Sequence, residues 1–282
     1  MDPWAGAWER ASAVEAPLYA QTQTIPKGGR RGSVTARAMH DDRRLYVLLE
    51  WNDRTKEESV GRSEGFADQA AVQFPAPAGE RIPAFCMGDP QASVNIWIWK
   101  ASRQADVDLG YRDLQQVYPR AVSDWYPFED KDIFYPPLAS GNVVASRAAT
   151  PVENLVAGQF GTLTTAPEQT VHGVGRWRDG RWRVLFARGL PAPGEGDAGF
   201  RVPGSTDIAF AIWDGARGDR NGQKSVSQFL SLDVSPERFA APSRLPLSAN
   251  QALLIGLGLT ALLALAYFAF GRLVGRERGE AS

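Results

Sequence analysis

The 282-residue chain has little cysteine and little histidine: Cys86 is its one cysteine, and His40 and His172 are its two histidines. A single cysteine excludes an intramolecular disulfide and a Cys-X-X-Cys-His haem attachment. An iron–sulfur cluster held by this chain alone would need more thiolates. Two histidines that lie 132 positions apart offer no local metal-ligand spacing. Any redox cofactor bound here must therefore be held by other side chains.

Charge of one sign is also missing, because 31 basic and 32 acidic residues leave a net charge of -1. Nucleic-acid binding would require a basic surface, which this balance does not provide. The N-terminal stretch MDPWAGAWERASAV has no basic n-region and no continuous apolar h-region, so no signal peptide is visible. Phosphate loops, dinucleotide fingerprints and nucleophile elbows are absent as well. The sequence therefore indicates neither a nucleic-acid-binding protein nor a stand-alone enzyme.

Apolar residues recur with the period of two that is typical of β-strands. Residues 33–53 alternate on both sides of a His-Asp-Asp-Arg turn, and residues 173–190 form a second predicted hairpin around Asp179-Gly180. A further strand is predicted within residues 206–215. With 28 glycines and 19 prolines as punctuation, the sequence predicts an all-β fold, a two-sheet antiparallel β-sandwich. Residues 105–142 are long, irregular and rich in aromatic residues, which indicates a lid, an interface or a disordered segment.

The C-terminal region contains 20 residues without a charge, Ala252 to Gly271. At 1.5 Å per residue a helix of this length spans roughly 30 Å, the thickness of a bilayer hydrocarbon core. A buried core helix is the alternative, but such helices seldom lack a polar face over this length. We therefore predict a sandwich domain over residues 1–240, a linker over 241–251, a transmembrane helix over 252–271 and a short basic tail over 272–282.

Two loops carry residues that could bind a metal, namely Met87 in a Gly-Asp-Pro turn and Lys224 at the end of a glycine-rich charged loop. On composition alone, Met87 is a packing residue and Lys224 a solvated charge. The strand that follows Met87 places Asn95, Trp97 and Trp99 on one face, because alternate strand residues share a face. Trp97 could wall a flat cofactor, or it could be a stacked core tryptophan, and the sequence leaves both possibilities open.

An ordered set of motifs resembles a known family. The motifs are FCMGD with VNIWIWK (85–89 and 94–100), GNVVAS (141–146), GQFGTLTT (158–165), GVGRWRDGRWRVLFARGL (173–190) and GDRNGQKSVSQFLSL (218–232). Together they resemble the haem b-binding subunit of the ethylbenzene dehydrogenase-like, type II dimethyl sulfoxide reductase family. Relatives of that subunit occur in selenate, chlorate and dimethyl sulfide enzymes and in nitrite oxidoreductase. The resemblance covers most of residues 30 to 235.

The resemblance implies a β-sandwich that holds one non-covalent haem b between a methionine and a lysine. The methionine of its Phe-x-Met-Gly motif matches Met87, and the lysine of its Asn-Gly-Gln-Lys motif matches Lys224. Phe85, Asn95 and Trp97 are then expected to contact the cofactor. Lysine must lose its proton to bind iron, which costs about 4.6 kcal/mol at pH 7 for a reference pKa near 10.4. Burial against a haem reduces that cost because it disfavours the ammonium form.

The function implied is that of a membrane-anchored cytochrome b subunit with no turnover of its own. By resemblance its partners are an iron–sulfur subunit and a molybdopterin catalytic subunit, and it exchanges electrons with a soluble cytochrome or the quinone pool. A slight basic excess after the helix favours a cytoplasmic tail and an extracytoplasmic, periplasmic domain on a single-pass membrane protein. The rival interpretations are a haemless carbohydrate-binding module and a haemless scaffold or anchor subunit.

Overall fold

In the computed structural model, residues 1–21, 28–29, 32–59, 62–76, 82–84, 87–110, 118–120 and 150–235 are described. Residues 1–236 form one compact unit. The secondary structure over the described ranges is almost entirely β-strand, with one nine-residue helix, α1, Ala101–Leu109. The strands are β1 Val14–Ala20, β2 Gly32–His40, β3 Arg44–Asn52, β4 Gln69–Pro75, β5 Val94–Lys100, β6 Val152–Ala157, β7 Thr164–Thr165, β8 His172–Arg178, β9 Arg181–Gly189, β10 Gly204–Trp213, β11 Ser225–Val226 and β12 Leu230–Val234.

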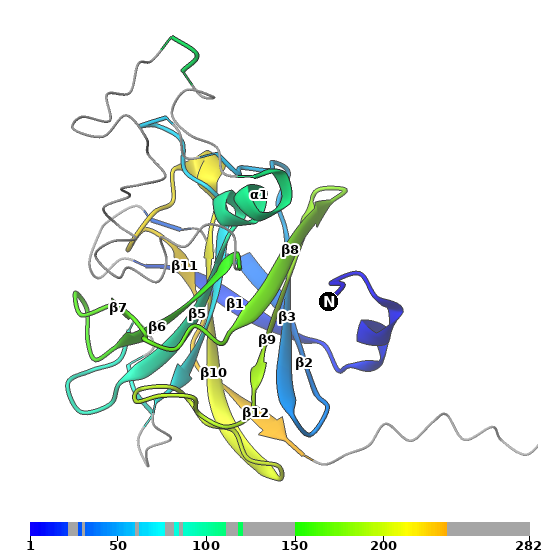
Figure 1. Ribbon diagram of the computed structural model, residues 1–282, viewed down its shortest axis with the longest axis vertical. Coiled ribbons are helices and arrows are strands. Elements are labelled where there is room, and N and C mark those ends of the chain that lie inside the picture. The colour runs from blue at the N-terminus through cyan, green and yellow to red at the C-terminus, as the bar shows by residue number, and fades with distance from the viewer. Residues whose placement is uncertain are drawn as a thin grey trace, which may run out of the picture. The chain divides into compact units, whose positions relative to one another are not determined.

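All strand pairings in the described residues are antiparallel, and they follow the order β7-β6-β5-β4-β10-β11-β1-β2-β3-β9-β8, with β12 beside β10 (Figure 1). We call β1, β2, β3, β9 and β8 the first half-sheet, and β10, β4, β5, β6 and β7 the second half-sheet. The two-residue strand β11 joins them by pairing with β1 on one side and β10 on the other. The two sheets expected from the sequence are therefore halves of one continuous hydrogen-bonded sheet, and the all-β antiparallel prediction is confirmed.

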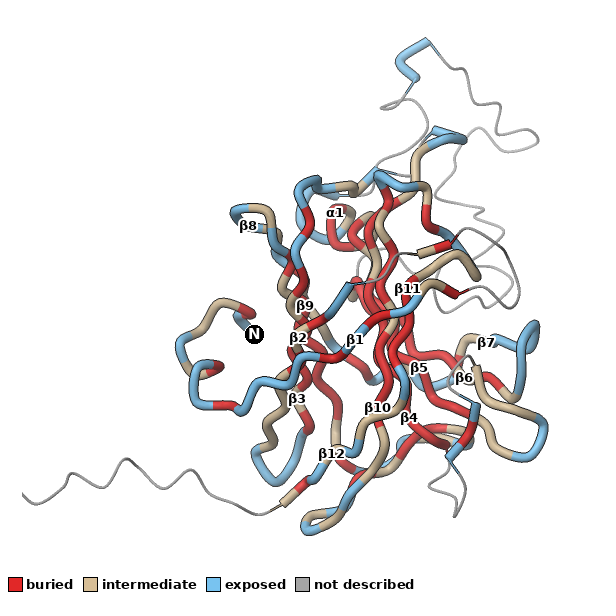
Figure 2. Tube along the Cα trace, turned by 180° about the vertical axis from the view of Figure 1, so that it is seen from behind, coloured by how far each residue is buried: buried red, intermediate tan, exposed pale blue. Residues whose placement is uncertain are grey.

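The two half-sheets face each other across a common core. Trp99 of β5 meets Trp182 of β9 with ring centroids 4.8 Å apart, and Trp182 stacks on Trp51 of β3 at 6.3 Å. Gly175 of β8 makes room for this contact, since a Cβ there would lie 2.2 Å from the Trp99 ring. Burial is nearly continuous along β4 and β5, and in β10 it is concentrated in the second half of the strand (Figure 2). The core between the half-sheets is thus built on tryptophans from β3, β5 and β9.

The predicted hairpins are confirmed at residue level. Strands β2 and β3 pair with Ala36 opposite Leu49, and β8 pairs with β9 around Asp179 and Gly180. Both turn residues have positive φ, 51° for Asp179 and 76° for Gly180, as a tight two-residue hairpin turn requires.

One sequence-based prediction needs correction, and another concerns residues outside the described ranges. Residues 105–109 were expected to begin an irregular stretch, but they complete α1, which lies at one end of the sheet beside β8 (Figure 1). The helix lacks a side-chain N-cap and basic residues in its last turn, so its sequence carries little helical signal. Within the described ranges no helix is long and apolar enough to cross a membrane. The predicted linker, transmembrane helix and tail lie outside these ranges, as do the domain limits drawn there.

Candidate functional site

The second half-sheet buries apolar side chains on its outer face as well as on its inner face. Strands alternate their side chains between the two faces of a sheet, so in β5 Trp97 and Trp99 point into the inter-sheet core while Ile96 and Ile98 point outward. Ile96 is 7% exposed and Ile98 8% exposed. We name the buried residues of this face the outer cluster: Ala71, Val94, Ile96, Ile98, Leu155, Ala157 and Trp213. This half-sheet is therefore buried on both faces, and its outer face is a second apolar surface that is separate from the core.

Met87 packs against the outer cluster from a tight turn. Its φ is 127°, a backbone conformation that few residues other than glycine adopt, and Gly88 follows with φ 75°. The N–H of Gly88 donates to the carbonyl of Ala84 at 3.0 Å, and a Cβ on Gly88 would lie 2.7 Å from the carbonyl oxygen of Ala92. Glycine is therefore required directly after Met87, and this turn fixes the direction in which the thioether leaves the backbone.

Lys224 lies between a two-residue turn and β11. Arg220 and Gln223 exchange backbone hydrogen bonds of 3.0 and 2.8 Å around the turn, and Lys224 follows at once. Its Nζ lies 5.0 Å from the centroid of the Trp213 ring, which belongs to the outer cluster. The indole Nε1–H of Trp213 donates to the carbonyl of Asn221 at 3.0 Å, so the same ring holds the turn in place. The amine is thereby directed over one aromatic residue of the outer cluster.

The structure thus brings Met87 and Lys224 to one apolar face, although 137 positions separate them in the sequence. Each offers a neutral lone pair to a metal, a thioether sulfur from Met87 and, once deprotonated, an amine nitrogen from Lys224. This donor set and the surrounding apolar face fit a haem, whose flat apolar ring needs burial and whose iron accepts methionine in cytochromes. Sequence reasoning missed Trp213, whose place beside Lys224 follows from a register that only the folded sheet supplies.

Two of the other predicted cofactor contacts, Trp97 and Asn95, lie on the opposite face of β5. Trp97 is fully buried in the inter-sheet core, 4.7 Å from the ring of Phe74 and 6.0 Å from that of Phe200. Asn95 is also fully buried there, on the face opposite the outer cluster. For Trp97 the structure therefore favours the core alternative over the cofactor wall. Phe85 and Cys86 lie outside the described residues.

Asn95 belongs to a buried polar network between the half-sheets. Its amide donates to Asn154 Oδ1 at 2.7 Å and to Asp197 Oδ1 at 3.2 Å, and its Oδ1 accepts from Arg188 Nη1 at 3.0 Å. Arg188 lies 4.8 Å above the Trp97 ring. Burial lowers the pKa of Arg188 to about 10, partly offset by the charge of Asp197, so the guanidinium stays protonated at neutral pH. The network accounts for Asn95 without a cofactor.

Three carboxylates meet at the opposite end of the core: Asp53, Asp68 and Asp214 have oxygens within 4.8 Å of one another. Asp68 is fully buried and accepts hydrogen bonds from the N–H groups of Gly215 and Glu57 and from Trp182 Nε1. Burial, helped by the charge of Asp53, raises the pKa of Asp68 to about 7, although the hydrogen bond from the Gly215 N–H opposes the rise. These partners tie β4, η2 (Gly215–Arg217) and β9 together, which is a structural role.

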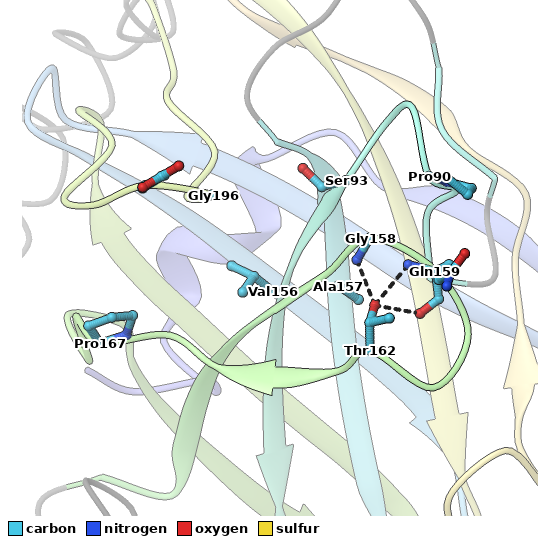
Figure 3. A pocket seen from close by; sticks show the side chains of 10 residues that line it. Pro90, Ser93, Val156, Ala157, Gly158, Gln159, Thr162, Pro167 and Gly196 are labelled. Carbon is cyan, nitrogen blue, oxygen red and sulfur yellow. Dashed lines mark hydrogen bonds between the residues drawn. The ribbon is translucent and has the colours of Figure 1, made fainter. Parts of the chain in front are cut away.

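A cavity of about 610 Å³ opens beside the turn that follows Met87 (Figure 3). Pro90 and Ser93 line it on that side, and the loop after β6 lines the other. In that loop the Thr162 hydroxyl accepts from the N–H groups of Gly158 and Gln159 at 2.9 Å each, so the loop is rigid. Of the residues predicted to bind a cofactor, the four in the described ranges, Met87, Asn95, Trp97 and Lys224, do not line this cavity.

Fold and site together define an all-β antiparallel protein in which a thioether and an amine side chain lie against one outer cluster of apolar residues. A family model described as ethylbenzene dehydrogenase matches residues 5–225. The chain therefore belongs to the ethylbenzene dehydrogenase family, and the resemblance drawn from its motifs is confirmed.

Three relatives are similar over most of this chain. The putative respiratory nitrate reductase heme subunit ORF7 of Haloferax mediterranei is 27% identical over 236 residues, which cover 83% of this chain and 68% of that protein. The chlorate reductase subunit gamma of Ideonella dechloratans is 27% identical over 229 residues, covering 80% and 75%. The dimethylsulfide dehydrogenase subunit gamma of Rhodovulum sulfidophilum is 28% identical over 207 residues, covering 71% and 59%.

Proposed function

We propose that this chain is the cytochrome b subunit of an oxidoreductase complex, in which one non-covalent haem b lies on the outer cluster with Met87 and Lys224 as axial ligands. The observation that carries the proposal is the meeting of these two donors at one buried apolar face. Family membership supports it, as does a relative named as a heme subunit. The names of the other relatives, subunits gamma of a reductase and a dehydrogenase, support a subunit role without its own turnover.

Bound haem would supply a one-electron redox centre, and the chain's own residues set its properties. The thioether of Met87 favours ferrous over ferric iron, which raises the reduction potential. The outer cluster excludes water from the metal and lowers the local dielectric. Because Met87 and Lys224 fill both axial positions, no position is left for a substrate. This arrangement suits electron transfer and not substrate chemistry.

The partners belong to the same proposal. Since the relatives are named as subunits of nitrate reductase, chlorate reductase and dimethylsulfide dehydrogenase, we infer an iron–sulfur subunit and a molybdopterin catalytic subunit as partners. A soluble cytochrome or the quinone pool would be the other electron partner. Residues 252–271 would anchor the subunit in the membrane, with residues 1–240 on the extracytoplasmic side.

The rival carbohydrate-binding module would need aromatic side chains on its surface. No tryptophan of the described ranges is exposed, and Trp51, Trp97, Trp99, Trp182 and Trp213 are all at most 5% exposed. These residues are already used in packing, so within those ranges the structure offers this rival no exposed tryptophan.

An absorption spectrum tests the proposal. Haem-replete protein should show a Soret band with sharp reduced α and β bands, as two strong axial ligands produce low-spin iron. Met87→Ala and Lys224→Ala should each change the spin state or release haem while the sandwich stays folded. The matched controls Met39→Ala on β2 and Lys100→Ala at the end of β5 should keep the wild-type spectrum.

Two results would contradict the proposal at different levels. A spectrum without a Soret band in haem-replete protein would rule out the cytochrome. Unchanged low-spin spectra in both ligand variants would mean that the axial assignment is wrong while the cofactor remains.

A further inference from the structure

The backbone of Lys224 is hydrogen-bonded to the segment that directly follows β1. The N–H of Gln21, the residue directly after β1, donates to the carbonyl of Lys224 at 2.9 Å. Gln21 is 4% exposed, so this bond is shielded from water. The pairing continues in β11, where Ala20 lies opposite Ser225 and Tyr19 opposite Val226. Lys224 is thus the first residue of a segment held by β1.

Two glycines cross the same segment at van der Waals contact. A Cβ on Gly28 would lie 2.1 Å from the Cα of Gln223, and a Cβ on Gly29 would lie 2.2 Å from the carbonyl oxygen of Lys224. Gly29 also has a positive φ of 71°. Any side chain at these positions would push against backbone atoms, which cannot rotate away as a side chain can. Glycine is therefore required at positions 28 and 29, because the backbone of Gln223 and Lys224 passes so close to them.

The buried carboxylate of Asp219 joins Gly29 to Asp214, at the start of the loop that leads to Lys224. Asp219 Oδ1 accepts from the N–H of Gly29 at 3.0 Å, and Oδ2 accepts from the N–H of Asp214 at 3.2 Å. Asp219 is 4% exposed. If the Asp219 carboxylate moved away, the buried N–H groups of Gly29 and Asp214 would lose their acceptor. This would cost free energy, so the two hydrogen bonds hold the carboxylate in position.

We propose that Gln21, Gly28, Gly29 and Asp219 form a clamp that positions Lys224 as an iron ligand, an inference that rests on the proposed function. A lysine side chain has many rotamers, and a mobile backbone would add to the freedom lost on metal binding. The clamp fixes the backbone beforehand, and Trp213 directs the side chain, so less freedom is lost when the amine binds. These are positioning residues, since none of them supplies a ligand.

Gly29→Ala and Asp219→Ala test the clamp, with haem loss to excess apomyoglobin and the low-spin fraction as readouts. We expect each variant to lose haem at least about tenfold faster, because removing residues that orient a metal ligand typically costs 10- to 100-fold in affinity. A high-spin component should appear at the same time. Asp219→Asn keeps one acceptor oxygen, which can serve the N–H of Gly29 but not that of Asp214 as well, so its haem loss should fall between those of Asp219→Ala and the wild type.

The control is a glycine with similar crowding away from Lys224. A Cβ on Gly173 of β8 would lie 2.4 Å from Val152 Cγ2 and 2.7 Å from the carbonyl oxygen of Leu185. Gly173→Ala should destabilise the sandwich and leave haem loss from the folded protein unchanged. Equal haem loss in Gly173→Ala and Gly29→Ala would reduce the clamp to general packing and overturn it.

Failure of the clamp and failure of the haem site give different results. If Lys224→Ala changes the spectrum but Gly29→Ala and Asp219→Ala keep wild-type spectra and haem-loss rates, the clamp is overturned and the ligand assignment stands. If Lys224→Ala itself leaves the spectrum unchanged, the ligand assignment and the clamp both fall. Should Gly29→Ala not fold, Asp219→Ala decides the matter, because it removes atoms and adds none.

Discussion

The outer faces of the two half-sheets are covered in different ways. On the first half-sheet, Trp8 and Ala11 of the N-terminal segment pack against Leu48 of β3 and Leu185 of β9 in a small cluster. Charged residues surround it, with Arg183 paired to Glu50 and stacked 4.2 Å from the Trp4 ring. On the second half-sheet, the outer cluster is wider, Gln73 and Glu153 lie beside its isoleucines on the same face, and Met87 and Lys224 reach it from separate loops. The first face is closed by the chain's own packing, whereas the second presents lone-pair donors over buried apolar surface. Only the second arrangement suits a metal cofactor.

The largest effect we expect concerns the core that both half-sheets share. Arg188→Met should lower the free energy of unfolding by about 3–5 kcal/mol, because the buried carboxylate of Asp197 would lose its counter-charge. Urea unfolding measures this loss. Adding Asp197→Asn should recover much of it, since the amide carries no charge. The haem spectrum of the folded protein should not change, and a changed spectrum would place the cofactor near the core and break the comparison.

A matched pair of truncations separates the two outer faces directly. Ile98→Ala in the outer cluster and Leu48→Ala under the N-terminal segment should each cost about 2–4 kcal/mol of unfolding free energy, because both side chains are buried. Thermal unfolding of the apoprotein measures that cost. Haem release should become faster in Ile98→Ala alone. If Leu48→Ala released haem equally fast, the second face would have no special role.

Stability should also depend on pH through Asp68, which links the ends of both half-sheets. The pKa of Asp68 is about 7 in the folded protein and about 3.8 for an ordinary aspartate, so the folded state holds a proton that the unfolded state releases. The stabilisation is therefore complete below about pH 4 and is lost as the pH rises through 7. Unfolding in urea between pH 4 and 8 should show this decline in the apoprotein. Asp68→Asn should flatten it, and an unchanged slope in that variant would assign the titration to another group.

The smallest effect belongs to the charged rim of the first outer face. Arg183→Ala removes an ion pair with Glu50 in which each side chain is 21% exposed, so the expected loss is about 0.2–1 kcal/mol. Added salt should reduce the difference between variant and wild type. A loss of haem from this variant would contradict the assignment of the cofactor to the second half-sheet.

Local rules predicted the hairpins well, because alternation and the Asp179-Gly180 turn act over neighbouring residues. The pairing of Trp177 with Trp182 across β8 and β9 follows from that turn alone. The face of β5 that carries Trp97 was also predicted, but its surroundings were not, since they depend on which strands lie opposite. The same limit applies to Trp213, whose contact with Lys224 requires the order of β10 and β11. Met87 and Lys224 were found through resemblance, because neither residue type stands out by composition.

The joint between the half-sheets is β11, only two residues long, and Lys224 precedes it directly. If Lys224 binds the haem iron as proposed, separation of the half-sheets at β11 would move β1 away from the segment that carries the lysine, and the iron would lose this ligand before the strands unfold. The absorption spectrum of the haem would then report the separation of the two half-sheets. On slow heating, the Soret band should shift at a lower temperature than the far-ultraviolet circular dichroism signal of the sheet.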